Sequence, residues 1–326
     1  MSAILVETFT ILLFALLLMV GILIGRTRSL FAAVMMSGIF SLLSASLFVV
    51  MDAVDVAFTE AAVGAGISTV LMLVTLHLTT DKESPPVKPQ TLPLLVSLLT
   101  GGALLYATAD FPAFGIADAP IHTSATAAHY VHQSYADSHI PNIVTTVLAS
   151  YRGYDTFGET TVVFTAAVAV MLLLGGSSKK SIVETIEKAD PIALVGAKML
   201  IPYILLFALY VQFHGDFGPG GGFQAGVIFA AGLILHALIF GLDALREKVP
   251  PIVVEIGIAL GALLYAGVGV VSMLMGGEFL HYGMLDTHDM AHGQHLGILL
   301  VELGVGITVT FVMVAIFYAF AGRSRQ

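Results

Sequence analysis

The sequence predicts an all-α polytopic membrane protein with about nine transmembrane helices. Of the 326 residues, 57% are hydrophobic and only 11% are charged, whereas soluble domains average about 25% charged residues. The mean hydropathy is +0.96. The apolar residues fall into runs of roughly 20, which is the length that a helix needs to cross a bilayer while bonding its own backbone.

These runs divide into groups of three, two and four spans, because two polar stretches interrupt the chain. Residues 81–90 (DKESPPVKPQ) form a Pro-rich linker. Residues 177–191 (SSKKSIVETIEKADP) are charged and predict a short surface helix. We therefore expect three domains at 1–82, 91–178 and 190–326. The expected spans cover residues 4–25, 31–50, 58–78, 92–109, 159–175, 193–213, 222–242, 252–275 and 296–321.

The second domain contains a long polar excursion before its second span, from residue 110 to residue 154. Residues 140–150 (IPNIVTTVLAS) within it are apolar but too few to cross a bilayer. We expect a re-entrant or interfacial helix at this point, and the fifth span can begin as early as Tyr154.

Lysine and arginine predict the orientation, because they are retained on the cytoplasmic side of a membrane. In the nine-span arrangement all of them except Arg152 fall on one side, which places the N-terminus outside and the C-terminus in the cytoplasm. The outer loops are instead rich in aspartate and histidine, so we expect that face to attract cations and to carry a pH-dependent charge.

Several chemistries are excluded or disfavoured by composition. The chain has no cysteine, which excludes disulfides, thiolate metal sites and iron–sulfur clusters. Its formal net charge is −9, which argues against a nucleic-acid partner. We expect no cofactor and no bound metal.

Ionisable residues inside spans are costly, so each is a functional candidate. Glu302 lies deepest and needs a partner or a wet cavity, while Glu60 heads the third span and Glu159 the fifth. Glu60 is followed by glycines that could permit a π-bulge or a close helix contact. A structural role, at a helix start or a helix contact, is the alternative for each. The weaker candidates are Glu255, His236, Asp155 and Arg152. Arg152 can form an ion pair with either Asp155 or Glu159 at the start of the fifth span.

Two outer segments also stand out. The string HGDFGPGGGFQAGV must form a tight, helix-breaking connection between the sixth and seventh spans, and close backbone packing explains it better than chemistry. Its notable residues are His214, Asp216, Pro219, Gly220, Gly221, Gly222 and Phe223. The second segment is a cluster that suits external proton acceptors better than zinc: His281, Asp286, His288, Asp289, His292 and His295.

Three strings resemble known families. Ile201 and Pro202, followed by LLFALYVQFHGDFGPGGGFQAGVIFAAGLIL, resemble the B subunit of the Mrp-type multisubunit cation/proton antiporters. FSLLSASLFVVMDAVDVAFTEAAVGAGISTVLML and NIVTTVLASYRGYDTFGETTVVFTAAVAVMLLLG resemble the end of the large A subunit, which is related to membrane-bound hydrogenase and respiratory complex I subunits. In the commoner layout these five spans end the A subunit, whereas here they precede the B-like part.

The resemblance implies a non-enzymatic, multi-pass subunit of a complex that exchanges Na⁺ for protons in the cell membrane of a prokaryote, with other antiporter subunits and lipid as partners. Glu60 and Glu159 match carboxylates of the A-subunit strings, so the resemblance implies a place in a lateral ion or proton path. Two alternatives stay open: a membrane subunit of a hydrogenase or complex I relative, and a purely structural scaffold.

Overall fold

Nine helices in the described part of the chain are long and apolar enough to cross a membrane, which confirms the predicted all-α polytopic class. The computed structural model describes residues 3–84, 91–113, 115–174 and 191–322. The surface helix expected at 177–191 lies almost entirely outside these residues. The spans are α1 (Ala3–Arg26), α2 (Leu30–Val50), α3 (Val54–Glu60) continued by η1 (Ala61–Ser68) and α4 (Thr69–Leu78), α5 (Thr91–Ala107), α9 (Gly153–Leu174), α10 (Pro191–His214), α11 (Gly222–Phe240), α13 (Pro251–Leu274) and α14 (Met290–Ala321).

Short elements fill the connections between the spans. The excursion before α9 contains α6 (Pro120–Thr123), α7 (Ala125–Ser138), α8 (Ile143–Thr145) and η3 (Thr146–Tyr151). The expected helix at 140–150 is thus observed from Ile143 onward, as short helical turns that cannot cross a bilayer. The remaining short elements are η2 (Thr108–Asp110), α12 (Leu242–Lys248) and η4 (Tyr282–Leu285).

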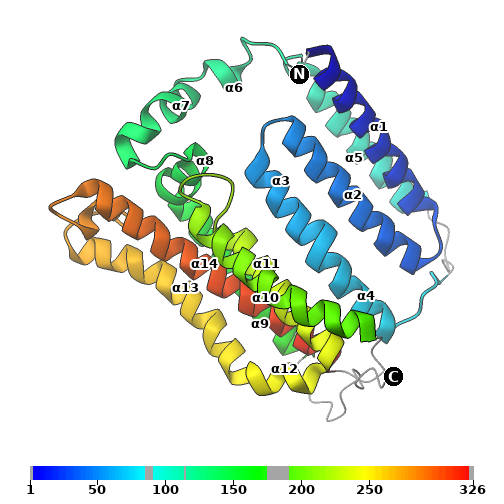
Figure 1. Cartoon of the computed structure of the whole chain (residues 1–326). Coiled ribbons are helices and arrows are strands. Elements are labelled where there is room, and N and C mark those ends of the chain that lie inside the picture. The colour runs from blue at the N-terminus through cyan, green and yellow to red at the C-terminus, as the bar shows by residue number, and fades with distance from the viewer. Residues whose placement is uncertain (1–2, 85–90, 114, 175–190, 323–326) are drawn as a thin grey trace.

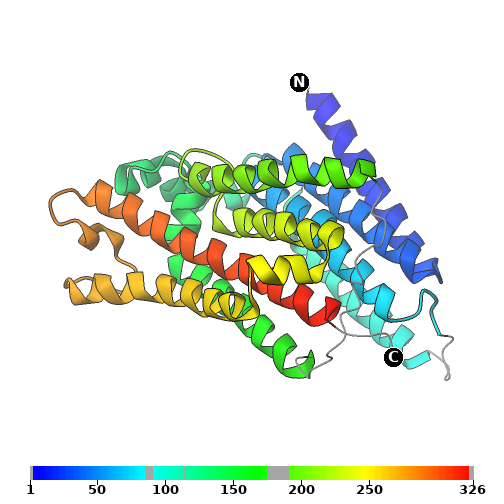
Figure 2. The same ribbon diagram turned by 60° about the horizontal axis from the view of Figure 1, so that its bottom comes forward.

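Helix α14 forms the centre of the last four spans (Figures 1 and 2). It is the most buried of the nine spans and packs against α13, α11 and α9. Glycines allow a close approach between these helices: a Cβ on Gly261 of α13 would lie 2.6 Å from the carbonyl oxygen of Gly304 on α14. Small residues at helix contacts are how membrane helices gain packing area when lipid supplies no hydrophobic driving force.

The first three spans form a separate layer beside this bundle, as Figure 1 shows. Helices α1 and α2 are antiparallel neighbours, and η1 connects their layer to α11. Within the described residues helix α5 makes no extensive contact with another span, and nearly all of its residues are exposed. The apolar surfaces of α1, α5 and α10 therefore need lipid or another protein to cover them.

Two turns that each contain a basic residue meet at one end of the first layer. The Leu30 N–H donates to the Asp81 carbonyl oxygen at 2.9 Å. The Glu83 N–H donates to the Arg28 carbonyl oxygen at 3.1 Å. Arg28 and the neighbouring Lys82 thus share an end of the molecule, as the positive-inside prediction requires. The membrane orientation itself stays a prediction.

We expect Gly261→Val to lower the free energy of unfolding by about 1–3 kcal/mol, because a side chain there forces α13 and α14 apart. Gly267→Val, on the same helix, is the matched control, because an added Cβ at Gly267 meets nothing within 4 Å. The measurement is thermal unfolding of the purified protein, and equal melting temperatures for both variants would contradict the predicted role of the close contact.

We expect Phe217→Cys to react with a membrane-impermeant thiol reagent on intact cells and Glu247→Cys to react only after permeabilisation. Both positions are exposed, and they lie in connections on opposite sides of α11. The chain has no native cysteine to interfere. Reaction of both variants on intact cells would show that the predicted orientation is wrong.

Candidate functional site

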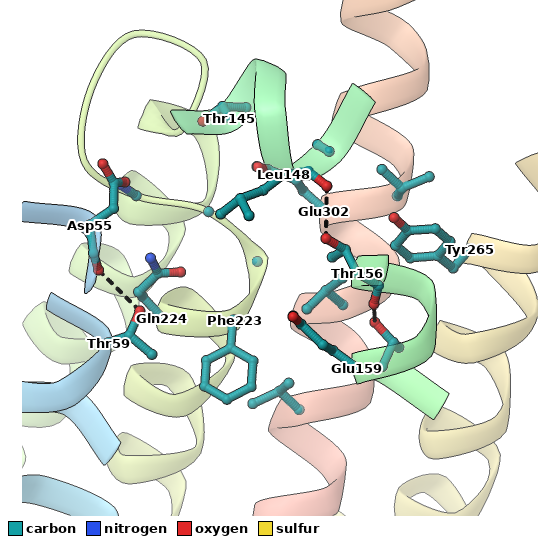
Figure 3. Close-up of a pocket in the computed structure, with 18 of the residues that line it drawn as sticks. Asp55, Thr59, Thr145, Leu148, Thr156, Glu159, Phe223, Gln224, Tyr265 and Glu302 are labelled. Atoms are coloured by element: carbon teal, nitrogen blue, oxygen red, sulfur yellow. Dashed lines mark hydrogen bonds between the residues drawn. The ribbon is translucent and has the colours of Figure 1, made fainter. Parts of the chain in front are cut away.

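A cavity of about 270 Å³ brings together carboxylates from all three expected domains (Figure 3). Asp55 comes from the first turn of α3, Glu159 from α9 and Glu302 from α14. Further polar groups in the lining are Thr59, Thr145, Thr156, Thr160, Gln224 and Tyr265. The walls of the cavity are mostly apolar, and the three carboxylates and these polar groups face into it.

Glu302 lies against the glycine turn that joins α10 to α11. A Cβ on Gly215 would lie 2.9 Å from Glu302 Oε2, and one on Gly221 would lie 3.3 Å from Glu302 Oε1. No hydrogen bond to this carboxylate is formed by the part of the chain that the structure describes. A carboxylate inside a span needs water, a proton or a cation to offset its desolvation, and the cavity has room for each of these.

The glycine turn can approach α14 only because it lacks side chains. A Cβ on Gly222 would lie 2.9 Å from the carbonyl carbon of Glu302 and 3.0 Å from the Gly306 nitrogen. Gly221 has a φ of +126°, a conformation that residues with a Cβ rarely adopt. The expectation of close backbone packing at this string is thus met by its geometry. Phe223 lines the cavity, whereas Pro219 is exposed.

Asp55 connects the first domain to the same turn. The Gly220 N–H donates to Asp55 Oδ1 at 3.1 Å, across 165 sequence positions. The sequence places Asp55 only among the acidic outer-loop residues, so its role at the cavity was missed. Its place in the first turn of α3 is the one signal that could have indicated it.

The second domain holds the turn through two residues that sequence reasoning also missed. Asn142 Nδ2 donates to the carbonyl oxygens of Gly215 at 3.0 Å and Gly218 at 2.9 Å. Thr145 Oγ1 donates to the Gly215 carbonyl oxygen at 2.6 Å. Asn142 also caps α8 by accepting from the Val144 N–H, and this capping role is all that its local sequence reveals.

Glu159 faces the cavity from the second turn of α9, and Arg152 does not pair with it. Arg152 Nε instead donates to Asp155 Oδ2 at 2.6 Å, and both side chains are more than half exposed. An exposed pair of this kind contributes ~0.2–1 kcal/mol. Thr156 donates to the Leu148 carbonyl oxygen at 2.7 Å, which ties the start of α9 to η3.

Glu60 lies outside the cavity. Its carboxylate lies close to Gly64 and Ser41, because a Cβ on Gly64 would meet Glu60 Oε1 at 2.8 Å and the Ser41 Cβ at 2.6 Å. The glycines after Glu60 do lie in a π-helical segment, η1. This segment and η3 are the π-helical interruptions in the described residues.

Two weaker candidates lie away from the cavity, around the connection between α11 and α13. Glu255 is exposed in the first turns of α13. His236 Nε2 lies 2.9 Å from Lys248 Nζ, so it accepts a hydrogen bond from the ammonium group. Neither geometry places these residues with the three cavity carboxylates.

The candidates on the predicted outer side form pairs, one of them across 79 sequence positions. His295 Nδ1 lies 3.1 Å from Asp216 Oδ2, and the His214 ring stacks on Tyr210 at 5.0 Å. Among the described residues, no group of three or more His, Asp or Glu side chains is placed to hold a metal ion.

The His/Asp cluster builds the start of α14. Asp289 caps the helix by accepting from the Ala291 and His292 N–H groups. A hydrogen bond from His292, at 2.8 Å, and the N–H groups of His288 and Asp289 hold the pKa of Asp286 below its ordinary value. His281 is exposed in the preceding loop.

Three family models match successive parts of the chain. Residues 15–81 match MbhD and residues 94–188 match MbhE, which are the D and E subunits of MBH, and residues 192–315 match the domain related to the MnhB subunit of Na⁺/H⁺ antiporter. Among curated proteins, the putative antiporter subunit mnhB2 of Staphylococcus haemolyticus is 33% identical over 138 residues, which are 42% of this chain and 97% of that protein. An uncharacterized protein of Methanocaldococcus jannaschii is 32% identical over 164 residues, covering 43% of this chain and 60% of that protein.

Solved structures share the fold. The Mrp complex from Dietzia sp. DQ12-45-1b contains a chain that superposes with a TM-score of 0.75 and 24% identity, covering 97% of this chain and 35% of that chain. The membrane-bound sulfane sulfur reductase, an archaeal respiratory membrane complex, contains one with a TM-score of 0.58 and 27% identity, covering 72% of this chain and 99% of that chain.

The fold and the cavity define a class, that of polytopic helical subunits with an acid-lined cavity inside the bundle. The relatives identify the family within this class. The chain belongs to the family of MnhB-related antiporter subunits, and its B-like part follows a region related to MbhD and MbhE.

We expect Gly222→Ala to destabilise the protein by about 1–3 kcal/mol, because the new Cβ would displace α14 at Glu302. Gly218→Ala is the matched control, because the three atoms nearest to its Cβ all belong to the movable His214 side chain. Thermal unfolding of both variants measures the difference. A melting temperature for Gly222→Ala equal to that of Gly218→Ala would contradict the close approach.

Proposed function

We propose that this chain is a non-enzymatic membrane subunit of a multisubunit antiporter that exchanges Na⁺ for protons, and that its acidic cavity forms part of the ion route. The observation that carries this proposal is the convergence of Asp55, Glu159 and Glu302 on one cavity. The names of the relatives support the antiporter assignment.

The cavity has the chemistry that a partly dehydrated monovalent cation requires. Carboxylate, hydroxyl, amide and backbone carbonyl oxygens are the ligands that hard cations prefer. An ion route also needs binding weak enough for the ion to leave, and oxygens spread around a cavity of this size meet that need. The carboxylates likewise accept protons, so both exchanged ions can use them in turn.

The exposed apolar helices support a place within a larger complex. Spans α1, α5 and α10 bury few or none of their residues within this chain. We propose that they contact other antiporter subunits and lipid in the cell membrane of a prokaryote. The three domains, at 1–82, 91–178 and 190–326, would then be the units that bring one cavity carboxylate each.

Glu60 has a separate place in this proposal. Its carboxylate lies beside Ser41 at the start of π-helical η1, outside the cavity. We propose that it serves a proton or ion step on the side of the first domain, independent of Glu302.

A second candidate function is a membrane subunit of a respiratory enzyme complex. It is favoured by the matches of residues 15–81 and 94–188 to MBH subunits and by the sulfane sulfur reductase structure. Purification of the native complex distinguishes the two functions, because a redox enzyme would co-purify with this chain only under the second.

We expect Glu302→Gln to lower Na⁺-driven proton exchange in inverted membrane vesicles by about tenfold or more, because the amide cannot carry the charge or the proton. Asp55→Asn and Glu159→Gln should also lower it. Glu247→Gln is the control, because Glu247 is exposed on α12, away from the cavity. Normal exchange in all three cavity variants, with the complex assembled, would refute an ion route here and favour a scaffold role.

A further inference from the structure

A second cavity lies beside the first, among the connections on the predicted outer side. Its volume is about 370 Å³, and its lining includes Asp137, Ser150, Tyr151, Glu278, His281 and Gln294. Like the carboxylate cavity, it contains residues from both the second and the third domain. We call it the outer cavity.

The π-helical segment η3 lies between the two cavities. Its residues Leu148 and Ala149 line the carboxylate cavity, whereas Ser150 and Tyr151 line the outer cavity. One short segment therefore contributes to the walls of both spaces. A π-helical turn is a strained form that occurs often at functional sites.

Two buried tyrosines of the third domain donate hydrogen bonds to the backbone of this segment and of the residue at which α9 begins. Tyr282 Oη donates to the Ala149 carbonyl oxygen at 2.8 Å, and Tyr265 Oη donates to the Gly153 carbonyl oxygen at 2.8 Å. Both side chains are fully buried. Carbonyls in the last turn of a helix have no partner within it, so the Tyr282 hydroxyl supplies what η3 lacks at its end.

The Tyr282 ring packs on α14 at a point between the residues that line the two cavities. It packs where Gly297 of α14 has no side chain, because a Cβ there would clash with the ring. Gly297 lies between Gln294, which lines the outer cavity, and Glu302, which lines the carboxylate cavity. Two residues before Tyr282, Leu280 has a φ of +64°, a conformation that bulky residues rarely adopt and that surrounding contacts must hold.

The outer side of η3 is held by polar side chains. Tyr151 Oη donates to Asp137 Oδ2 at 2.5 Å, and His129 Nε2 lies 3.1 Å from the same oxygen. Ser150 Oγ donates to Gln294 Oε1 at 3.1 Å. Burial and the bond to Asp137 raise the pKa of Tyr151 to about 12, so this hydroxyl stays protonated and remains a donor.

We infer that Tyr282 and Tyr265 are positioning residues that hold η3 as the partition between the two cavities, and that cations reach Glu302 from the outer cavity past this partition. This inference rests on the proposed function, and it adds the outer cavity as the entrance of the ion route. Neither tyrosine is required to bind the ion.

The route is tested by blocking the outer cavity in the assembled complex. Ser150→Cys is treated with a positively charged, membrane-impermeant methanethiosulfonate, and we expect Na⁺/H⁺ exchange to fall about fivefold and to recover when the adduct is reduced. Thr287→Cys is the matched control, since Thr287 is exposed on the same side but does not line the cavity. The wild-type complex, treated alike, corrects for thiols in other subunits. Gln294→Cys replaces Ser150→Cys if that variant does not assemble.

The partition is tested by the rate at which Leu148→Cys reacts with the methanethiosulfonate, since Leu148 lines the carboxylate cavity. In the Tyr282→Phe background we expect this thiol to react about fivefold faster with the same reagent, because one hydroxyl holding η3 is lost while the ring remains. Tyr318→Phe is the matched control, because Tyr318 Oη makes an equivalent 2.8 Å bond to the Val249 carbonyl oxygen, away from both cavities. A purely structural loss would lower complex yield and stability without this selective change in reactivity.

The outcomes separate the route from the proposed function. Full exchange after modification at Ser150 would overturn the outer entrance, even where Glu302→Gln abolishes exchange and the proposed function stands. Equal Leu148→Cys reactivity in the Tyr282→Phe and Tyr318→Phe backgrounds would overturn the partition. Normal exchange in Glu302→Gln would refute the proposed function, and the reactivity comparison would still decide the partition.

Discussion

The close approach of the glycine turn to α14 is the contact on which the site depends. It places the Gly220 N–H where Asp55 can accept from it and the Gly215 carbonyl where Asn142 and Thr145 can donate to it. A Cβ at Gly222 would clash with the backbone of Glu302. Since the first and second expected domains both bond to this turn of the third, any side chain that moved the turn would separate the cavity carboxylates from one another.

The cavity explains how a bundle of apolar helices tolerates its acidic side chains. Lipid cannot solvate a carboxylate, so an ionisable side chain in a span must face protein or a polar space. Glu159 and Glu302 both face the cavity, and Asp55 is satisfied in part by the Gly220 N–H. The irregular backbone of η3 is likewise bonded by a neighbouring group, because the Tyr282 hydroxyl donates to the Ala149 carbonyl oxygen.

The arrangement of the chain also relates two families of complexes. The B-like domain supplies Glu302, the glycine turn and both tyrosines, whereas the regions related to MBH subunits supply Asp55, Glu159 and η3. The superposition on the Mrp complex extends over 97% of this chain at 24% identity, which shows that the fold is shared. The fold is therefore shared although about three quarters of the aligned residues differ.

The sequence alone determined the spans and the grouping of charges, because a bilayer demands roughly 20 apolar residues per helix and retains cations on one side. It also indicated Glu159 and Glu302, since both lie in apolar runs. It could not choose Asp55 over Glu60. Five positions along a helix rotate the side chain by about 140°, so one of the two faces the cavity only once neighbouring helices are in place. The bonds of Asn142, Thr145 and Tyr282 cross from 70 to 133 positions, and no local pattern encodes contacts at that separation.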